Sequence, residues 1–260
     1  MKGIIYYNAE EAKRNHAFIK DILKESNELG IEMELMTVPP VEPFDFILFR
    51  DRDPELALEL EQAGYRVFNR ASIQKIANDK LRTFELASLL GLPAVPTFRT
   101  EQLPELPFVL KTRTGHGGTE VFLCETAQQA EEVLNRYELN EVIAQPFIDS
   151  NAMDVRVFML GNEVLGAVKR TGAKGSFKSN FTLGGTVEKY TLNVTETKQV
   201  QTISRAISSD YIGIDFILSS NGGWLLNEIE DPVGARSLYT THNFSVARKL
   251  MEYVKAQLEK

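Results

Sequence analysis

The sequence predicts an α/β protein that opens with a parallel sheet and becomes richer in β-strands after residue 93. Short apolar runs alternate with amphipathic helical segments through the first seventy residues, which is typical of β-α-β units. A group of prolines then interrupts the chain, and shorter strands follow it. These prolines are Pro93, Pro96, Pro104 and Pro107.

The opening part is predicted to form a small parallel lobe. Strands are expected at residues 3–7, 31–38, 45–49 and 65–68, and helices at residues 10–29 and 54–63. Each of these helices ends at a glycine, and so does a third helix over residues 72–90. The lobe carries no glycine-rich dinucleotide fingerprint, which argues against a nicotinamide or flavin dinucleotide site.

The remainder is predicted to form two β-rich sections. The first has strands at residues 108–111, 120–123 and 142–145 and a helix at 127–137. The second has strands at 155–160 and 164–169, a glycine-punctuated loop at 172–185, a helix at 196–209, a hairpin at 214–230 and a final helix at 244–258.

The hairpin carries the strongest chemical signal. Two apolar runs flank Asn221-Gly222, a pair that favours a two-residue turn. With this pair at the centre of the turn, Asp215 lies opposite Glu228, and strand alternation brings Glu230 to the same face. Ionised carboxylates held this close repel one another, so we expect a compensating cation, for which Mg²⁺ is the usual choice. The alternative is that the two glutamates line the solvated face of an ordinary hairpin.

A glycine-rich loop, Thr114-Gly115-His116-Gly117-Gly118, joins two predicted strands. A Walker-type loop and a dinucleotide fingerprint both open a helix, so neither fits here. A glycine loop between strands is able to close over phosphates as a lid, with Lys111 reaching them as a point charge. A mobile turn without function is the competing interpretation. The sequence argues against a protein kinase, because the chain has no His-Arg-Asp and Asp215-Phe216 is not followed by glycine.

Composition limits the remaining classes. The formal net charge of −7 argues against a general nucleic-acid binder. The single cysteine, Cys124, excludes an intrachain disulfide. The apolar runs are too short for a signal peptide or a membrane span, so a cytoplasmic protein without membrane contact is expected.

From Ser72 onward the order of motifs resembles the ATP-grasp ligases and, among them, the RimK-like carboxylate-amine ligases. The resemblance implies an ATP-grasp fold: an N-terminal Rossmann-like lobe at residues 1–77, a central lobe at 78–145 and a C-terminal lobe at 146–260, the last two clamping ATP. Nucleotide-binding roles are implied for Lys80, Lys111, Gly115, Gly117, Gly118, Gln145, Pro146, Phe147, Ile148, Asp154, Lys178 and Asn180.

The same resemblance implies a metal site and a reaction. Asp215, Glu228 and Glu230 match the metal-ligand positions, for two ions of Mg²⁺ or Mn²⁺. ATP would activate a carboxylate as an acyl phosphate, which an amine attacks to give an amide. Arg236 could orient the carboxylate, and Arg156 and Arg170 are rival candidates for stabilising the acyl phosphate.

The expected partners are ATP and a carboxylate and an amine, for example glutamate joined to a peptide, a protein tail or a small molecule. A homo-oligomer is left open. The chain departs from the family pattern at Glu230, where asparagine is usual, and at Pro146, where glutamate is usual. Two alternatives stay open: a regulatory nucleotide-binding protein on a degenerate ATP-grasp fold, and a phosphotransferase to an acceptor other than an amine.

Overall fold

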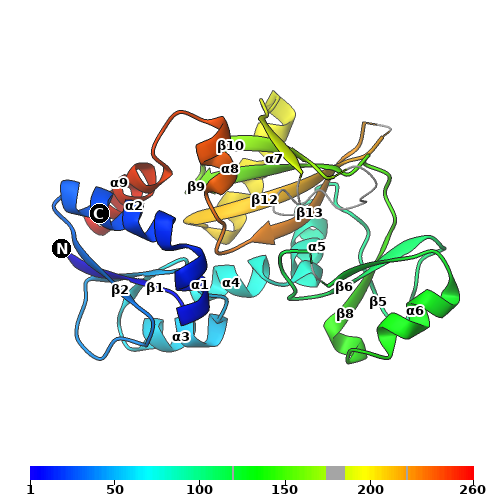
Figure 1. The fold of residues 1–260 in the computed structure, drawn as a ribbon, viewed down its shortest axis with the longest axis horizontal. Helices are drawn as coiled ribbons and strands as arrows, with labels where there is room; N and C mark the ends of the chain where they lie inside the picture. The colour runs from blue at the N-terminus through cyan, green and yellow to red at the C-terminus, as the bar shows by residue number, and fades with distance from the viewer. Residues whose placement is uncertain (119, 174–184, 221) are drawn as a thin grey trace.

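The computed structural model describes residues 1–118, 120–173, 185–220 and 222–260. The described strands form three sheets, of four, five and four strands. The three sheets lie in a row along the long axis of the molecule, and the five-stranded sheet lies between the two four-stranded sheets (Figure 1). None of the described helices is long and apolar enough to cross a membrane.

The first sheet is parallel, as the β-α-β pattern predicts. Its strand order is β2-β1-β3-β4, with β1 at Lys2–Tyr6, β2 at Glu32–Met36, β3 at Phe46–Phe49 and β4 at Arg66–Phe68. The helices of this part are α1 at Ala9–Arg14, α2 at His16–Glu28 and α3 at Pro54–Gln62. The single helix expected at 10–29 is therefore interrupted at Asn15, whose side chain donates to the Glu11 carbonyl at 2.8 Å.

The helix expected over residues 72–90 is also two helices, α4 at Ala71–Ala77 and α5 at Lys80–Leu89. Asp79 caps α5, because its side chain accepts from the backbone N–H of Leu81 at 3.0 Å and of Arg82 at 3.4 Å. The apolar periodicity runs through both helices and hides this break. The cap makes Lys80 the first residue of α5.

The second sheet has the order β5-β8-β6-β7 and is antiparallel. Its strands are β5 at Phe98–Arg99, β6 at Phe108–Thr112, β7 at Val121–Cys124 and β8 at Val142–Pro146, with α6 at Ala127–Leu134 and a 3₁₀ turn at Leu139–Glu141. The glycine loop thus joins two antiparallel strands, β6 and β7, as predicted. The two-residue strand β5 and the 3₁₀ turn were not predicted, since segments this short show no period.

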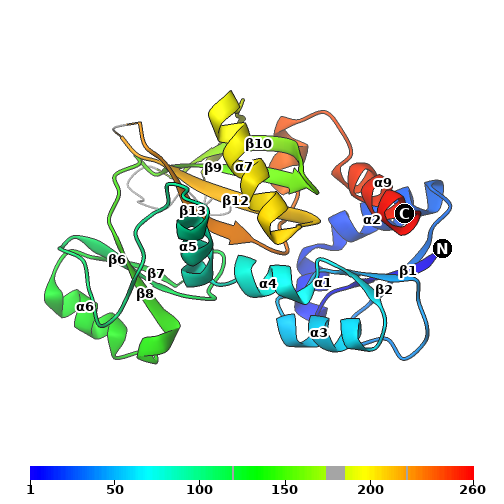
Figure 2. The same ribbon diagram turned by 180° about the vertical axis from the view of Figure 1, so that it is seen from behind.

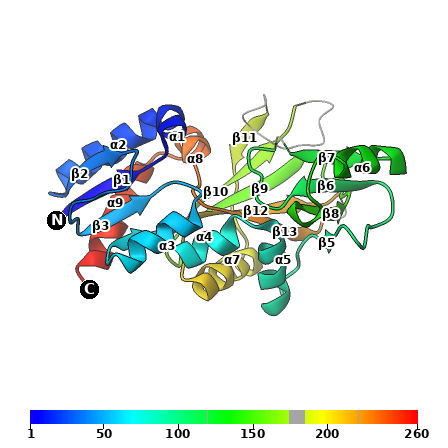
Figure 3. The same cartoon turned by 90° about the horizontal axis from the view of Figure 1, so that it is seen from below.

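The third sheet has the order β11-β10-β9-β12-β13 and is antiparallel. Its strands are β9 at Met153–Leu160, β10 at Glu163–Thr171, β11 at Thr186–Lys189, β12 at Tyr211–Leu218 and β13 at Trp224–Glu230. Helices α5 and α7, the latter at Val194–Ile207, cover one face of this sheet (Figures 2 and 3). Strand β11 was not predicted.

The last two helices are α8 at Arg236–Thr241, which was not predicted, and α9 at Val246–Leu258. Helix α9 lies beside α2 of the first lobe (Figure 1). Phe18 and Ile22 of α2 share one apolar core with Leu250 and Val254 of α9. The C-terminal end of the chain therefore completes the core of the N-terminal lobe. The lobe boundaries near residues 77 and 145 stay predictions.

The register of the β12–β13 hairpin is right at the predicted carboxylates and wrong nearer the turn. Asp215 pairs with Glu228 and Gly213 with Glu230, as a two-residue turn would require. Phe216, however, pairs with Leu226, and a β-bulge separates the two registers. Strand β12 ends at Leu218 and β13 begins at Trp224, and the bulge at Asn227 restores the pairing of the carboxylates. Asn221 of the predicted turn lies outside the described residues.

Candidate active site

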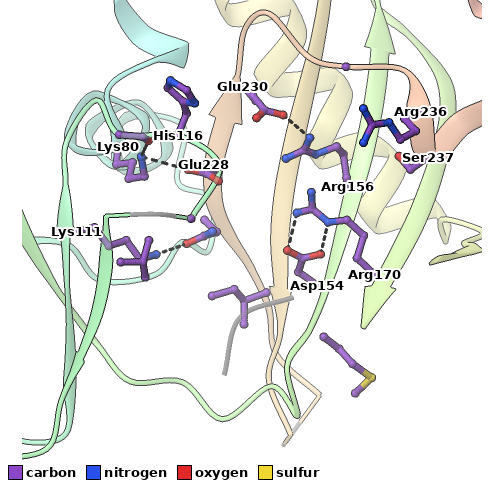
Figure 4. Close-up of a pocket in the computed structure, with 18 of the residues that line it drawn as sticks. Lys80, Lys111, His116, Asp154, Arg156, Arg170, Glu228, Glu230, Arg236 and Ser237 are labelled. Atoms are coloured by element: carbon purple, nitrogen blue, oxygen red, sulfur yellow. Dashed lines mark hydrogen bonds and ion pairs between the residues drawn. The ribbon is translucent and has the colours of Figure 1, made fainter. Parts of the chain in front are cut away.

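A cavity of about 630 Å³ lies between the second and third sheets and extends to the helices α1, α2 and α8. Residues from each of the three lobes line it, among them the glycine loop and residues 145–148 at the end of β8. Two groups of cations face each other across it (Figure 4). We call Lys80 and Lys111 the lysine wall, and Arg156 and Arg170 the arginine wall.

The lysine wall is held by contacts to the glycine loop and to β13. Lys80 Nζ donates to the Gly115 carbonyl at 2.5 Å and lies 3.4 Å from Glu228 Oε2. Lys111 Nζ donates to Asn227 Oδ1 at 3.1 Å. Burial, together with the nearby Lys80 cation, lowers the pKa of Lys111 to about 8. The predicted pair of phosphate-binding lysines is thus brought to one side of the cavity.

The arginine wall follows from cross-strand register. Arg156 lies opposite Asp215, and Arg170 lies opposite Asp154, on neighbouring strands of the third sheet. Arg156 binds Asp215 through two hydrogen bonds of 2.7 and 2.6 Å. Arg170 binds Asp154 through two of 2.6 Å and reaches Asp215 at 2.7 Å. Both guanidinium groups are therefore fixed in orientation by paired carboxylates.

Asp215 is the shared acceptor of the arginine wall. Its side chain is 1% exposed, and it is not among the described residues that line the cavity. Burial opposes ionisation, but Arg156 and Arg170 outweigh it and lower the pKa of Asp215 to about 2. Asp215 thus lies beneath the two guanidinium groups.

The two glutamates of the hairpin line the cavity and are also paired. Glu228 faces Lys80, and Glu230 forms an ion pair with Arg156 (Figure 4). Burial raises the pKa of Glu230. In the part of the chain that the structure describes, no three acidic, histidine or cysteine side chains are grouped closely enough to hold a metal.

The expected convergence of three carboxylates on one spot is therefore not found. The sequence argument required a compensating cation, and in this structure arginine and lysine side chains supply it. Glu228 and Glu230 still fit Mg²⁺ as hard oxygen donors at the cavity, since this ion needs only one or two protein carboxylates beside phosphate oxygens and water. The metal-ligand roles of Asp215, Glu228 and Glu230 stay predictions.

The glycine loop contributes Gly115, Gly117 and Gly118 to the cavity. Gly117 and Gly118 have φ values of 69° and 72°, in the left-handed region that favours glycine. At Gly115 a Cβ would lie 2.0 Å from Thr112 Oγ1, so no side chain fits there. Glycine is therefore favoured at position 115 by the packing of neighbouring side chains and at positions 117 and 118 by the backbone conformation.

The predicted adenine linker also lines the cavity, through Gln145, Pro146, Phe147 and Ile148. Gln145 is buried and donates to Thr97 Oγ1 at 2.9 Å. Apolar side chains that sequence reasoning did not single out complete this end, and they offer the surface that a flat ring requires. They are Val95, Val109, Val121, Met153 and Ile217.

The opposite end of the cavity is formed by α8 and the N-terminal helices. Arg236 and Ser237 of α8 lie beyond the arginine wall, on the side away from Lys80 (Figure 4). Phe18 and Asp21 of α2 line the same end and were missed, because a helix pattern marks them only as one face of α2. Lys178 and Asn180, two further predicted site residues, lie outside the described residues.

The chain is similar to known proteins over most of its length. The model of the RimK-like ATP-grasp domain family matches residues 94–254. A probable alpha-L-glutamate ligase of Shewanella sp. (strain ANA-3) is 31% identical over 209 residues, which cover 75% of this chain and 69% of the relative.

Two solved structures share the fold. D-cycloserine synthetase DcsG has a TM-score of 0.78 at 15% identity, over 99% of this chain and 100% of its own. The ATP-grasp ligase PsnB, solved with a minimal precursor, has a TM-score of 0.73 at 15% identity, over 98% of this chain and 99% of its own. These likenesses confirm the mixed α/β fold of ATP-grasp ligases, and the family model covers more than half of the 260 residues. The chain therefore belongs to the RimK-like ATP-grasp family of carboxylate-amine ligases.

Proposed function

We propose that this enzyme uses ATP to phosphorylate a carboxylate and then joins the acyl group to an amine. The observation that carries the proposal is the opposition of the lysine wall and the arginine wall across one cavity. Phosphates need cations on both sides during transfer, because charge develops on the transferring group and on the leaving ADP.

The nucleotide would lie at the end formed by β8 and the glycine loop. The apolar side chains around Phe147 suit the adenine ring, and Pro146 leaves a backbone carbonyl but no side-chain carboxylate for it. Lys80, Lys111 and the loop N–H groups would bind the phosphates. Asp154 would act through Arg170, which it holds at 2.6 Å, and Lys178 and Asn180 are proposed from the resemblance alone.

Glu228 and Glu230 would hold a divalent ion, Mg²⁺ or Mn²⁺, with Asp215 joining them where the arginines release it; two such ions are proposed. Held there, such ions would supply positive charge that offsets the charge developing on the phosphates during transfer. Glu230 adds a negative charge where the family usually has asparagine, which favours tighter binding of the ion.

The proposed reaction consists of two nucleophilic displacements, the first at phosphorus and the second at the acyl carbon. A carboxylate oxygen attacks the γ-phosphorus, the bond to the β,γ-bridging oxygen breaks, and ADP leaves. A neutral amine then attacks the acyl carbon, phosphate leaves, and the amine loses its proton. Arg236 would orient the carboxylate, and the arginine wall would bind the acyl phosphate. Closure of the glycine loop would exclude water, which otherwise hydrolyses the intermediate.

Glutamate is the amine substrate that we propose, and a peptide or protein tail is the acceptor. A relative at 31% identity bears the name of a probable alpha-L-glutamate ligase, and a structure of the similar ligase PsnB contains the precursor peptide PsnA2. Arg14, Asp21 and Arg236 at the far end of the cavity supply charges of both signs, as an amino acid requires.

One observation favours a second candidate, a nucleotide-binding protein without ligase activity. The three metal-ligand candidates are paired with arginine or lysine, and among the described residues no three-ligand metal group is formed. Such a protein would bind ATP without turning it over.

The experiment that separates these functions is Mg²⁺-dependent ADP release from ATP across a panel of carboxylates and amines, with and without hydroxylamine. ADP together with a hydroxamate is the expected result and identifies the carboxylate. ADP without hydroxamate would contradict acyl-phosphate formation and favour another phosphoryl acceptor. ATP binding without any ADP release would favour the second candidate.

A further inference from the structure

The segment from Asp231 to Ala235 connects β13 to α8 and carries Arg236 and Ser237 to the cavity. Its path decides where these two side chains lie relative to the arginine wall. Asp231 and Val233 are fully buried and Ala235 is 3% exposed. On its inner side Val233 packs so closely on β12 that a Cβ at Gly213 would lie 2.7 Å from Val233 Cγ2. The inner side of the segment therefore packs on the third sheet, and its burial means that its outer side is covered as well.

Two polar side chains of the first lobe cover that outer side. Arg50 follows β3 and Asn69 follows β4, and these strands are parallel neighbours, so both residues lie at the same edge of the first sheet. Arg50 Nη2 donates to the Val233 carbonyl at 2.5 Å. Asn69 Nδ2 donates to Asp231 Oδ1 at 3.0 Å. The segment is therefore tied to the first lobe at Asp231 and at Val233.

Arg50 is an unusual buried cation. It is 2% exposed, and its guanidinium lies over the rings of Tyr7, Phe18 and Tyr211, with the guanidinium carbon 5.5–6.0 Å from each centroid. Its Nε donates to the Tyr7 hydroxyl at 3.2 Å, and no ion pair to it is formed by the residues that the structure describes. Burying a cation in this way is unfavourable unless its donors are used. The planar guanidinium group of arginine supplies both donors, Nε for the Tyr7 hydroxyl and Nη2 for the Val233 carbonyl.

Asn69 fixes the same junction from a second direction. Its Oδ1 accepts from the backbone N–H of Asp210 at 2.7 Å and of Tyr211 at 3.1 Å, and its Nδ2 donates to the Tyr211 carbonyl at 2.8 Å. It therefore holds the start of β12 and the end of β13 together. Neither Arg50 nor Asn69 is among the described residues that line the cavity.

We propose that Arg50 and Asn69 are positioning residues for the carboxylate end of the active site. They set the segment from Asp231 to Ala235, and through it Arg236, against the arginine wall, while the nucleotide end is built by other elements. This inference rests on the proposed function in one respect, which is that Arg236 binds the carboxylate of the substrate. It predicts that disturbing Arg50 affects carboxylate use and leaves ATP binding unchanged.

The test compares Arg50→Met, which keeps much of the volume and removes all donors, with Arg50→Lys, which keeps the charge but not the fork. Arg70→Met is the matched control, because Arg70 also crosses from the first lobe but donates to the Ser208 carbonyl, at 2.9 Å, and not to the segment. Three quantities are measured: ATP affinity, hydrogen exchange of the peptide spanning residues 231–241, and KM and kcat for the carboxylate found in the ADP-release panel.

We expect both Arg50 variants to keep the wild-type ATP affinity and to raise exchange of residues 231–241 about ten-fold, with residues 78–118 unchanged. The KM for the carboxylate should rise about ten-fold, more in Arg50→Met than in Arg50→Lys, and Arg70→Met should match wild type. In an Arg236→Ala background the Arg50→Met change should add little further loss, because Arg50 acts through Arg236.

Fully additive losses in that double variant, or unchanged exchange at residues 231–241, would overturn the proposal. An equal loss of ATP affinity would do the same, since it would show a general structural role. If Arg50→Met does not fold, Arg50→Lys is judged by the same criteria. If wild type turns over no carboxylate, the proposed function fails, and the exchange measurement still decides whether Arg50 holds the segment.

Discussion

Arg156 and Asp215 face each other on neighbouring strands, β9 and β12, and form a two-point ion pair in which Asp215 is 1% exposed and Arg156 is 14% exposed. Asp215 accepts from Arg170 as well, at 2.7 Å. One carboxylate thus orients two of the cations that face the cavity. A residue that the sequence marks as a metal ligand is in this structure also the anchor of the arginine wall.

We expect Asp215→Ala to lower the free energy of unfolding by about 3–5 kcal/mol, because two buried guanidinium groups lose their shared partner. Urea denaturation at pH 7 measures this. Glu188→Ala is the control, since its pair with Lys169 is at the surface, where ion pairs contribute about 0–1 kcal/mol. Equal effects of the two changes would contradict the buried role of Asp215.

The same residue predicts an acid dependence. The pKa of Asp215 is lowered in the folded state to about 2, against about 3.9 in an unfolded chain. Its contribution to stability is therefore present above pH 4 and is lost as the pH falls from about 4 to about 2. In Asp215→Ala this part of the acid transition should be absent, as denaturation followed by circular dichroism would reveal.

Lys111 predicts an alkaline dependence of nucleotide binding. Its pKa of about 8 means that it is charged below pH 8 and neutral above. ATP affinity should therefore fall as the pH rises from about 7 to about 9. Lys111→Arg should remove this dependence, because arginine stays charged, and Lys111→Ala should weaken binding about ten-fold or more at pH 7. Calorimetric titration at the two pH values measures both, and an unchanged affinity in Lys111→Ala would remove this lysine from the site.

Arg236→Ala should reduce kcat/KM for the carboxylate about 100-fold and leave ATP affinity within about two-fold of wild type. The reason is that Arg236 lies at the end of the cavity away from the lysine wall. The control is Arg205→Ala, an exposed arginine on α7, which covers the other face of the third sheet. Loss of ATP affinity parallel to the loss of turnover would assign Arg236 a structural role instead.

Gly117→Ala should slow ADP release while costing about 1 kcal/mol of stability, because φ at this position is 69° and alanine is strained there. A Cβ at Gly117 meets no atom within 4 Å, so the effect is conformational and not steric. Gly64→Ala is the matched control, with φ of 95°, an equally open position and no place in the cavity. It should cost similar stability and leave ADP release unchanged; equal kinetic effects would contradict a lid role.

Local patterns predicted much of the fold, and the resemblance in motif order pointed to many of the residues that line the cavity. The parallel opening, the antiparallel glycine loop and most helices follow from period and turn chemistry. Capping side chains were underestimated: Asn15 and Asp79 end or begin helices within runs that look continuous. Strand β11 and helix α8 are too short to show a period.

The site was harder to predict where it depends on long-range register. Local reasoning paired Asp215 with Glu228 on an unbulged hairpin, and this pairing is right only because the bulge at Asn227 offsets the different register nearer the turn. The pairing of Asp215 with Arg156 depends on β9 lying beside β12, and no turn joins these strands. Arg156 was therefore a candidate from motif order, but its partner was not foreseen.

The packing of α9 on α2 also bears on how this chain folds during synthesis. A ribosome that has made the first sheet has not yet made residues 246–258, so Phe18 and Ile22 lack part of the apolar surface that finally covers them. The core of the first lobe therefore stays partly exposed until residues 246–258 have emerged and pack on α2. Any truncation before Val246 should leave this lobe prone to aggregate, although all four of its strands are intact.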